Sequence, residues 1–86
     1  MAHFVYILRS LKDHRLYVGE TRDVQKRLDR HNSGLTRSTR HRGPFELVAA
    51  KRLPDRSAAL RLEKLLKTLA GSEEKNRLVA EGRIEL

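Results

Sequence analysis

The chain has 86 residues, a net charge of +8 and no cysteine. That length allows one hydrophobic core, so we expect a single domain over residues 1–86. The lack of cysteine excludes disulfides, zinc–thiolate sites and thiol nucleophiles. No apolar run approaches membrane-spanning length, and the apolar run that opens the chain ends at Arg9, too soon for a signal peptide. We therefore expect a cytoplasmic protein.

The positive charge indicates a polyanionic partner. Nucleic acid is the first candidate, because each Lys or Arg that neutralises a phosphate releases a condensed counterion. The alternative is a basic surface that only keeps a small protein soluble. No membrane partner is expected.

The N-terminal residues predict a β-hairpin. His3–Ser10 and Arg15–Glu20 are rich in β-branched and aromatic residues, with a polar turn between them. Side chains alternate between the two faces of a strand, so pairing of Ser10 with Arg15 would place both tyrosines among five residues on one face. The residues of that face are Phe4, Tyr6, Leu8, Tyr17 and Gly19. Tyr6 would then lie opposite Gly19 and diagonal to Tyr17. A connection with an odd number of residues would place the two tyrosines on opposite faces.

A helix and a strand follow the hairpin. Thr21 and Asp23 are good N-cap residues, and the helix runs to about Asn32, where Ser33 and Gly34 end it. Arg27 and His31 are i,i+4 neighbours on this helix. Residues 35–43 are polar and basic and predict a loop, and residues 45–53 predict a third strand.

The C-terminal part predicts two more helices. One runs from about Ser57 to about Ala70, and its apolar arc comprises Leu62, Leu65, Leu66 and Leu69. Glu63 projects at the edge of that arc. A short last helix, capped at Ser72, runs to about Glu81, and Ile84 and Leu86 are expected to anchor the tail. The predicted fold is α+β, a small three-stranded antiparallel sheet flanked by helices on both faces in the order β-β-α-β-α-α.

Several motifs in order carry a family resemblance. Phe4-Val5-Tyr6 and Tyr17-Val18-Gly19 are followed by the stretch 23–34 with Arg27 and His31, and then by the stretch 59–67 with Glu63. Together they resemble the GIY-YIG nuclease superfamily, most closely its small single-domain bacterial members. The glycine and isoleucine of the first motif are replaced here, and its tyrosine is kept. We expect none of the separate DNA-recognition domains that larger members carry, and we assign no function to Asn76.

The resemblance implies a catalytic site composed of Tyr6, Tyr17, Arg27, His31 and Glu63. Tyr6 would be the general base for the attacking water, Tyr17 would position water or phosphate, and His31 would orient Tyr6 or shuttle its proton. Arg27 is suited to a phosphate oxygen. Glu63 is a hard oxygen ligand for one Mg²⁺ or Mn²⁺ ion.

Other residues are expected to contact nucleic acid. Gly19 would leave space for the phosphate, and a set of basic residues would follow the backbone. This basic set comprises Arg37, Arg40, Arg42, Arg61, Lys64 and Lys67. Each candidate also has an ordinary structural explanation, such as an i,i+4 ion pair between Glu63 and Lys67.

The resemblance implies a metal-dependent endonuclease that hydrolyses DNA phosphodiester bonds, leaving a 5′-phosphate and a 3′-hydroxyl. Its specificity would be low or based on DNA structure, and its role would lie in DNA repair or recombination. RNA stays open as a substrate. The alternatives are a non-catalytic basic nucleic-acid-binding module that keeps the nuclease scaffold, and a small subunit that supplies or docks to a partner nuclease.

Overall fold

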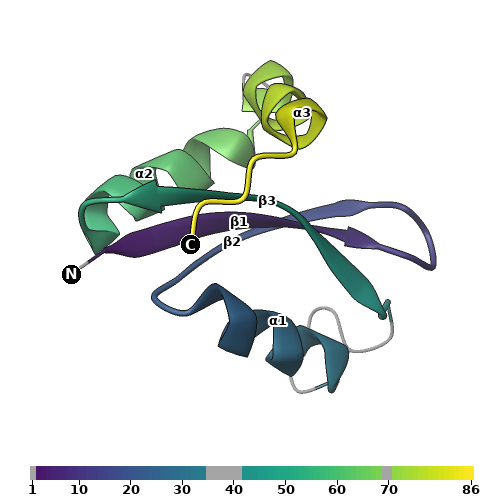
Figure 1. The fold of residues 1–86 in the computed structure, drawn as a ribbon. Helices are drawn as coiled ribbons and strands as arrows, with labels where there is room; N and C mark the ends of the chain where they lie inside the picture. The colour runs from purple at the N-terminus through teal and green to yellow at the C-terminus, as the bar shows by residue number, and fades with distance from the viewer. Residues whose placement is uncertain (1, 35–41, 69–70) are drawn as a thin grey trace.

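The computed structural model describes residues 2–34, 42–68 and 71–86. It confirms the predicted α+β fold and its order of elements (Figure 1). The third strand matches its predicted bounds, and the first helix ends at the predicted residue. The elements are β1 (His3–Ser10), β2 (Leu16–Thr21), α1 (Val24–Asn32), β3 (Phe45–Leu53), α2 (Arg56–Leu66) and α3 (Ser72–Glu81).

The strands form one antiparallel sheet in the order β2-β1-β3. The backbone N–H of Ser10 donates to the carbonyl of Arg15 at 2.9 Å, so the hairpin connection is even-numbered, as predicted. Tyr6 is paired with Gly19, and Leu8 is paired with Tyr17. Because side chains alternate along a strand, this register places both tyrosines on one face of the sheet.

Helices cover both faces of the sheet, and each covered face has its own core (Figure 1). On the face of α2 and α3, the buried residues are Val5, Ile7, Ala49, Ala59 and Leu66. On the face of α1, they are Tyr6, Leu8, Val24, Phe45 and Ala50. The sheet is therefore the middle layer of the molecule, and the tyrosine face lies under α1.

Polar side chains fix the ends of α1. The carboxylate of Asp23 caps the helix by accepting the backbone N–H of Lys26. At the other end, the Asn32 side chain accepts the backbone N–H of Phe45 at 2.7 Å and donates to its carbonyl at 3.2 Å. These two bonds attach the last turn of α1 to the start of β3, which fixes the neighbouring His31 over the sheet.

The face and the end of α2 differ from the prediction. Leu65 is 46% exposed, whereas Leu66 and Ala59 are fully buried. The buried arc is therefore rotated toward Glu63. The helix ends at Leu66, four positions before the predicted Ala70, because the Thr68 hydroxyl bonds the Leu65 carbonyl at 2.7 Å and turns the chain. Leu69 and Ala70 lie outside the described residues.

The C-terminal part differs from the prediction in the N-cap of α3 and in how the tail is attached. Gly71, not Ser72, is the N-cap of α3, with no side-chain cap bond. A Cβ at Gly71 would lie 2.0 Å from the Leu65 carbonyl oxygen, so only glycine fits this turn. Ile84 and Leu86 are exposed. The tail is attached instead through backbone bonds, since Ala50 donates to the carbonyl of Arg83 and accepts the N–H of Glu85.

Among the described residues, no helix combines the length and the apolar character that a membrane span requires.

The corrected face of α2 gives a stability prediction. Leu66→Ala should lower the free energy of unfolding by about 2 to 5 kcal/mol, because it leaves a cavity between α2 and the sheet. Leu65→Ala is the matched control and should cost less than about 1 kcal/mol, because Leu65 is half exposed. Urea unfolding followed by circular dichroism measures both. Equal losses would contradict the helix orientation described above.

Candidate active site

Tyr6 lies at the centre of the candidate site, where its ring crosses the backbone of Gly19. The side chain is only 4% exposed. A Cβ at Gly19 would lie 2.3 Å from the Tyr6 hydroxyl oxygen, well inside van der Waals contact. The phenol can reach the β2 edge of the sheet only because its cross-strand partner has no side chain.

Two residues of α1 contact the Tyr6 hydroxyl. Nε2 of His31 lies 3.1 Å from the hydroxyl oxygen, and the Nε–H of Arg27 donates to the same oxygen at 3.4 Å. Arg27 and His31 lie one turn apart, so both face the sheet. Arg27 can only donate, so the Tyr6 oxygen is the acceptor in that bond, whereas the direction of the Tyr6–His31 bond depends on the tautomer of His31.

The pKa values in this group depend on burial and on Arg27. Burial raises the pKa of Tyr6, while the hydrogen bond and the charge of Arg27 oppose that increase. The carboxylates of Glu63 and Glu20 raise the pKa of Tyr6 further. Burial, followed by the charges of Arg27 and Arg30, lowers the pKa of His31. At neutral pH the phenol is therefore protonated and the imidazole is neutral.

Tyr17 shares the face of Tyr6 but makes different contacts. Its ring packs edge-on against Phe45, with 5.4 Å between the ring centroids. The side chain is half-buried, and its hydroxyl bonds no residue in the part of the chain that the structure describes. The structure therefore does not bring Tyr17 into the hydrogen-bonded group of Tyr6, Arg27 and His31.

Glu63 approaches from α2, on the other face of the sheet. Its side chain is 20% exposed, and Oε2 lies 3.5 Å from Nζ of Lys67. This is the i,i+4 ion pair that the sequence predicted as the non-catalytic explanation for Glu63. The same carboxylate also acts on the pKa of Tyr6, so it is not directed only at solvent.

The donor set around Glu63 restricts the type of metal site. Within the described ranges, no group of three or more His, Cys, Asp or Glu side chains could hold an ion. A partly exposed single carboxylate suits Mg²⁺ or Mn²⁺, which keep most of their water ligands. It does not suit a structural zinc site.

Sequence reasoning missed Glu20 and His3. Glu20 accepts a hydrogen bond from the buried ring of His3 and lies 4.0 Å from Arg56. Both residues occupy the face of their strands that also carries Val5 and Val18. A carboxylate and an imidazole on an apolar strand face were a detectable signal, because buried polar groups require partners.

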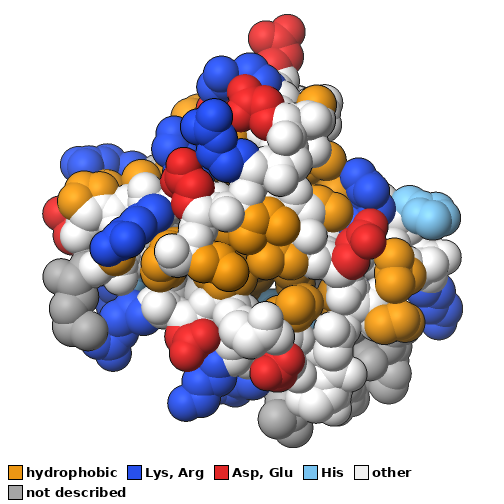
Figure 2. Space-filling model, viewed as in Figure 1, with side chains coloured by type: hydrophobic (Ala, Val, Ile, Leu, Met, Phe, Trp, Pro, Cys, Tyr) orange, Lys and Arg blue, Asp and Glu red, His pale blue; other side chains and the backbone are white. Residues whose placement is uncertain are grey.

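The described members of the predicted basic set lie in two places, near the hairpin turn and on or just after α2. Arg42 pairs with Asp13 at 3.2 Å near the hairpin turn, and Lys67 pairs with Glu63. Arg61 and Lys64 are exposed on α2. In Figure 2, basic side chains surround the margin of the visible face and apolar side chains occupy its middle. Arg37 and Arg40 lie outside the described residues.

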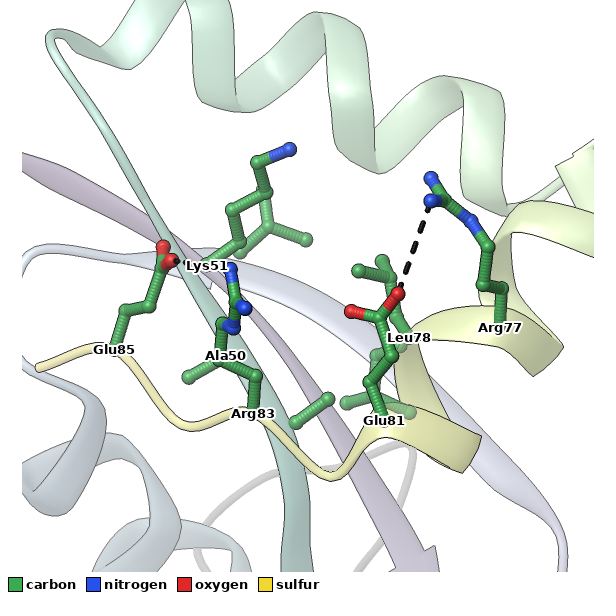
Figure 3. A pocket seen from close by; sticks show the side chains of 10 residues that line it. Ala50, Lys51, Arg77, Leu78, Glu81, Arg83 and Glu85 are labelled. Atoms are coloured by element: carbon green, nitrogen blue, oxygen red, sulfur yellow. Dashed lines mark ion pairs between the residues drawn. The ribbon is translucent and has the colours of Figure 1, made fainter.

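A separate hollow of about 210 Å³ lies between β3, α3 and the C-terminal tail (Figure 3). Val5, Ile7 and Leu78 form its apolar part, and charged side chains such as Glu81 and Arg77 surround its opening. It contains none of the predicted site residues.

Comparison with known proteins shows which family this chain resembles. The family described as the GIY-YIG catalytic domain matches residues 2–77. The chain is 42% identical over 80 residues to the UPF0213 protein YhbQ of Escherichia coli (strain K12), covering 92% of this chain and 78% of the relative. It is 41% identical over 80 residues to the UPF0213 protein NP_0776A of Natronomonas pharaonis, covering 92% of each chain. The solution NMR structure of the UPF0213 protein BH0048 from Bacillus halodurans has a TM-score of 0.57 and 40% identity, covering 95% of this chain and 87% of that chain.

The close approach of Tyr6 to Gly19 gives a second prediction. Gly19→Ala should lower the free energy of unfolding by about 1 to 3 kcal/mol, because the new methyl group displaces the Tyr6 ring. In a Tyr6→Leu background the same substitution should cost clearly less, because no phenol remains above the strand. A double-mutant cycle from urea unfolding measures this coupling. Additive losses would show that the two residues do not meet.

Burial of His31 gives a prediction about pH. The pKa of His31 in the folded protein lies below its ordinary value of 6.5. Below that pH, the imidazole of His31 therefore binds a proton more readily in the unfolded chain than in the folded protein. The free energy of unfolding should be independent of this group above about pH 6.5, and it should fall as the pH drops toward the lowered pKa. Urea unfolding at about pH 7.5 and about pH 5.5 measures the loss. His31→Gln should show a smaller loss, and an unchanged loss would contradict the burial of a neutral His31.

Proposed function

This chain belongs to the GIY-YIG catalytic domain family, and we propose that it is a metal-dependent endonuclease that hydrolyses DNA phosphodiester bonds. The observation that carries the proposal is the hydrogen-bonded group of Tyr6, Arg27 and His31. Low or structure-based specificity is part of the proposal.

Arg27 is proposed to hold the scissile phosphate. Its Nε donates to Tyr6, and in the described residues its guanidinium makes no ion pair. The two terminal amino groups are therefore available for phosphate oxygens, which they can contact at two points. A positive charge beside the phosphorus also stabilises the negative charge that develops in the transition state.

Tyr6 and His31 are proposed to remove the proton from the attacking water. A buried phenol with a raised pKa is a poor base by itself. Nε2 of the neutral His31 can accept the Tyr6 proton while the Tyr6 oxygen takes the proton of the water. The water oxygen then bonds to phosphorus as the bond from phosphorus to the 3′ oxygen breaks. The 3′ oxygen keeps the electron pair and takes a proton from solvent, so the products are a 5′-phosphate and a 3′-hydroxyl.

Glu63 is proposed as the metal ligand. When bound, Mg²⁺ or Mn²⁺ would supply positive charge for the phosphate and lower the pKa of bound water. The partly exposed carboxylate leaves room for the ion to keep its waters. Tyr17 stays a candidate for positioning water or phosphate, since its half-buried hydroxyl has no partner in the described residues.

The proposal predicts cleavage that depends on metal and on named residues. Purified protein with Mg²⁺ or Mn²⁺ should nick duplex, flapped or branched DNA, and EDTA should stop the reaction. Glu63→Gln and Arg27→Gln should each lower the rate by about 10²-fold or more, because each removes charge stabilisation at phosphorus. Glu46→Gln is the matched control, because that carboxylate is exposed on β3 and, among the described residues, its ion pair is with Arg9.

Gel analysis of cleavage on single-stranded, duplex, flapped and branched DNA tests the endonuclease proposal. If no substrate is cut with either metal, the endonuclease proposal fails for DNA. Salt-sensitive binding that neither EDTA nor Glu63→Gln affects would instead support the non-catalytic binding module.

A further inference from the structure

An open cleft of about 660 Å³ lies at the end of β2, beside α1 and the start of α2. Its lining includes the cations Arg22, Lys26, Arg27 and Arg56 and the carboxylates Glu20 and Asp23. Arg27 connects the cleft with the buried Tyr6 through its hydrogen bond. The cleft is therefore the solvent-facing approach to the candidate active site.

The two carboxylates in this cleft are already engaged. Asp23 caps α1 by accepting the backbone N–H of Lys26 at 3.0 Å. Glu20 is bonded by His3 and lies 4.0 Å from Nη2 of Arg56. The Glu20 side chain is 19% exposed, whereas that of Arg56 is 70% exposed. His3 therefore fixes Glu20 in place, and Arg56 is the solvent-exposed partner of this ion pair.

Among the described residues, fewer of the cations in the cleft than of the carboxylates have a partner of opposite charge or a hydrogen-bond donor that offsets their charge. Arg22 and Lys26 are exposed, and neither makes an ion pair within the described part of the chain. An exposed ion pair such as Glu20–Arg56 contributes little to stability, and α2 already has its own N-cap in Asp55. The cleft thus presents excess positive charge that the fold itself does not need.

We infer that this cleft binds the DNA backbone beside the scissile phosphate, with Arg22, Lys26 and Arg56 contacting the flanking phosphates. Glu20 occupies Arg56 in the free protein and competes with phosphate for it, which limits the affinity. The inference rests on the proposed function, because it takes DNA as the ligand. It assigns the backbone contacts to residues outside the basic set that the sequence suggested.

Binding measured without cleavage tests the inference. Fluorescence anisotropy of labelled duplex DNA in EDTA, at several salt concentrations, gives the dissociation constant and its salt slope. Arg22→Gln, Lys26→Gln and Arg56→Gln should each weaken binding by about threefold or more and reduce the slope by about 1. Glu20→Gln should tighten binding, because it frees Arg56 while the amide oxygen can still accept the bond from His3.

The C-terminal tail provides matched controls on the far side of β3. Arg83 is 71% exposed and lies 4.0 Å from Glu85, almost the same exposure and distance as in the Arg56–Glu20 pair. Arg83→Gln and Glu85→Gln therefore report the effect of one unit of charge away from the cleft. If Arg56→Gln and Glu20→Gln change binding no more than these controls, the inference is wrong.

The binding experiment can fail or succeed independently of the cleavage experiment that tests the proposed function. DNA cleavage that persists while the cleft variants bind like wild type would overturn the inference alone. Cleft-dependent binding by a protein that cuts no DNA would support the binding site and overturn the nuclease. Absence of DNA binding by the wild-type protein would overturn the inference outright.

Discussion

The position of the Tyr6 phenol over the bare backbone of Gly19 is the constraint on which the candidate site depends. It requires the even hairpin connection that pairs these two residues, and it requires a partner without a side chain. A one-residue slip would turn Tyr6 to the face of α2, away from Arg27 and His31. The hairpin register therefore determines whether the three side chains can meet.

The three-layer arrangement explains how residues from both faces can act together. Tyr6, Arg27 and His31 lie on the face of α1, while Glu20 and Glu63 belong to the face of α2. β2 is an edge strand, so groups at its outer edge lie near both faces of the sheet. The effects of both carboxylates on the pKa of Tyr6 are consistent with a site at this sheet edge.

The sequence predicted most of the fold because its signals were local. Strand alternation and the Asp23 cap each depend on near neighbours. The errors arose where tertiary contacts decide. Leu65 and Leu66 are equally apolar, and only the position of the sheet determines which one is buried. The backbone bonds that attach the tail at Ala50 have no signature in side-chain chemistry.

The same distinction applies to the site. The family motifs predicted that Tyr6, Arg27 and His31 belong together, and the structure brings these three into contact. Spacing alone could not predict that Tyr17 packs against Phe45 or that Arg42 pairs with Asp13, because those partners are distant in sequence. Glu20 was overlooked because its partner His3 lies across the sheet.

In the proposed mechanism, the charge of Arg27 links phosphate binding to the basicity of His31. In the free protein that charge lowers the pKa of His31 and opposes the increase in the pKa of Tyr6. A phosphate bound to Arg27 would offset the charge, so both pKa values would rise. His31 would become the better proton acceptor and Tyr6 the weaker acid. Because the proposed relay ends with the proton on His31, the higher pKa of His31 would favour removal of the water proton when the phosphate is in place, so Arg27, the proposed phosphate ligand, would also influence the base.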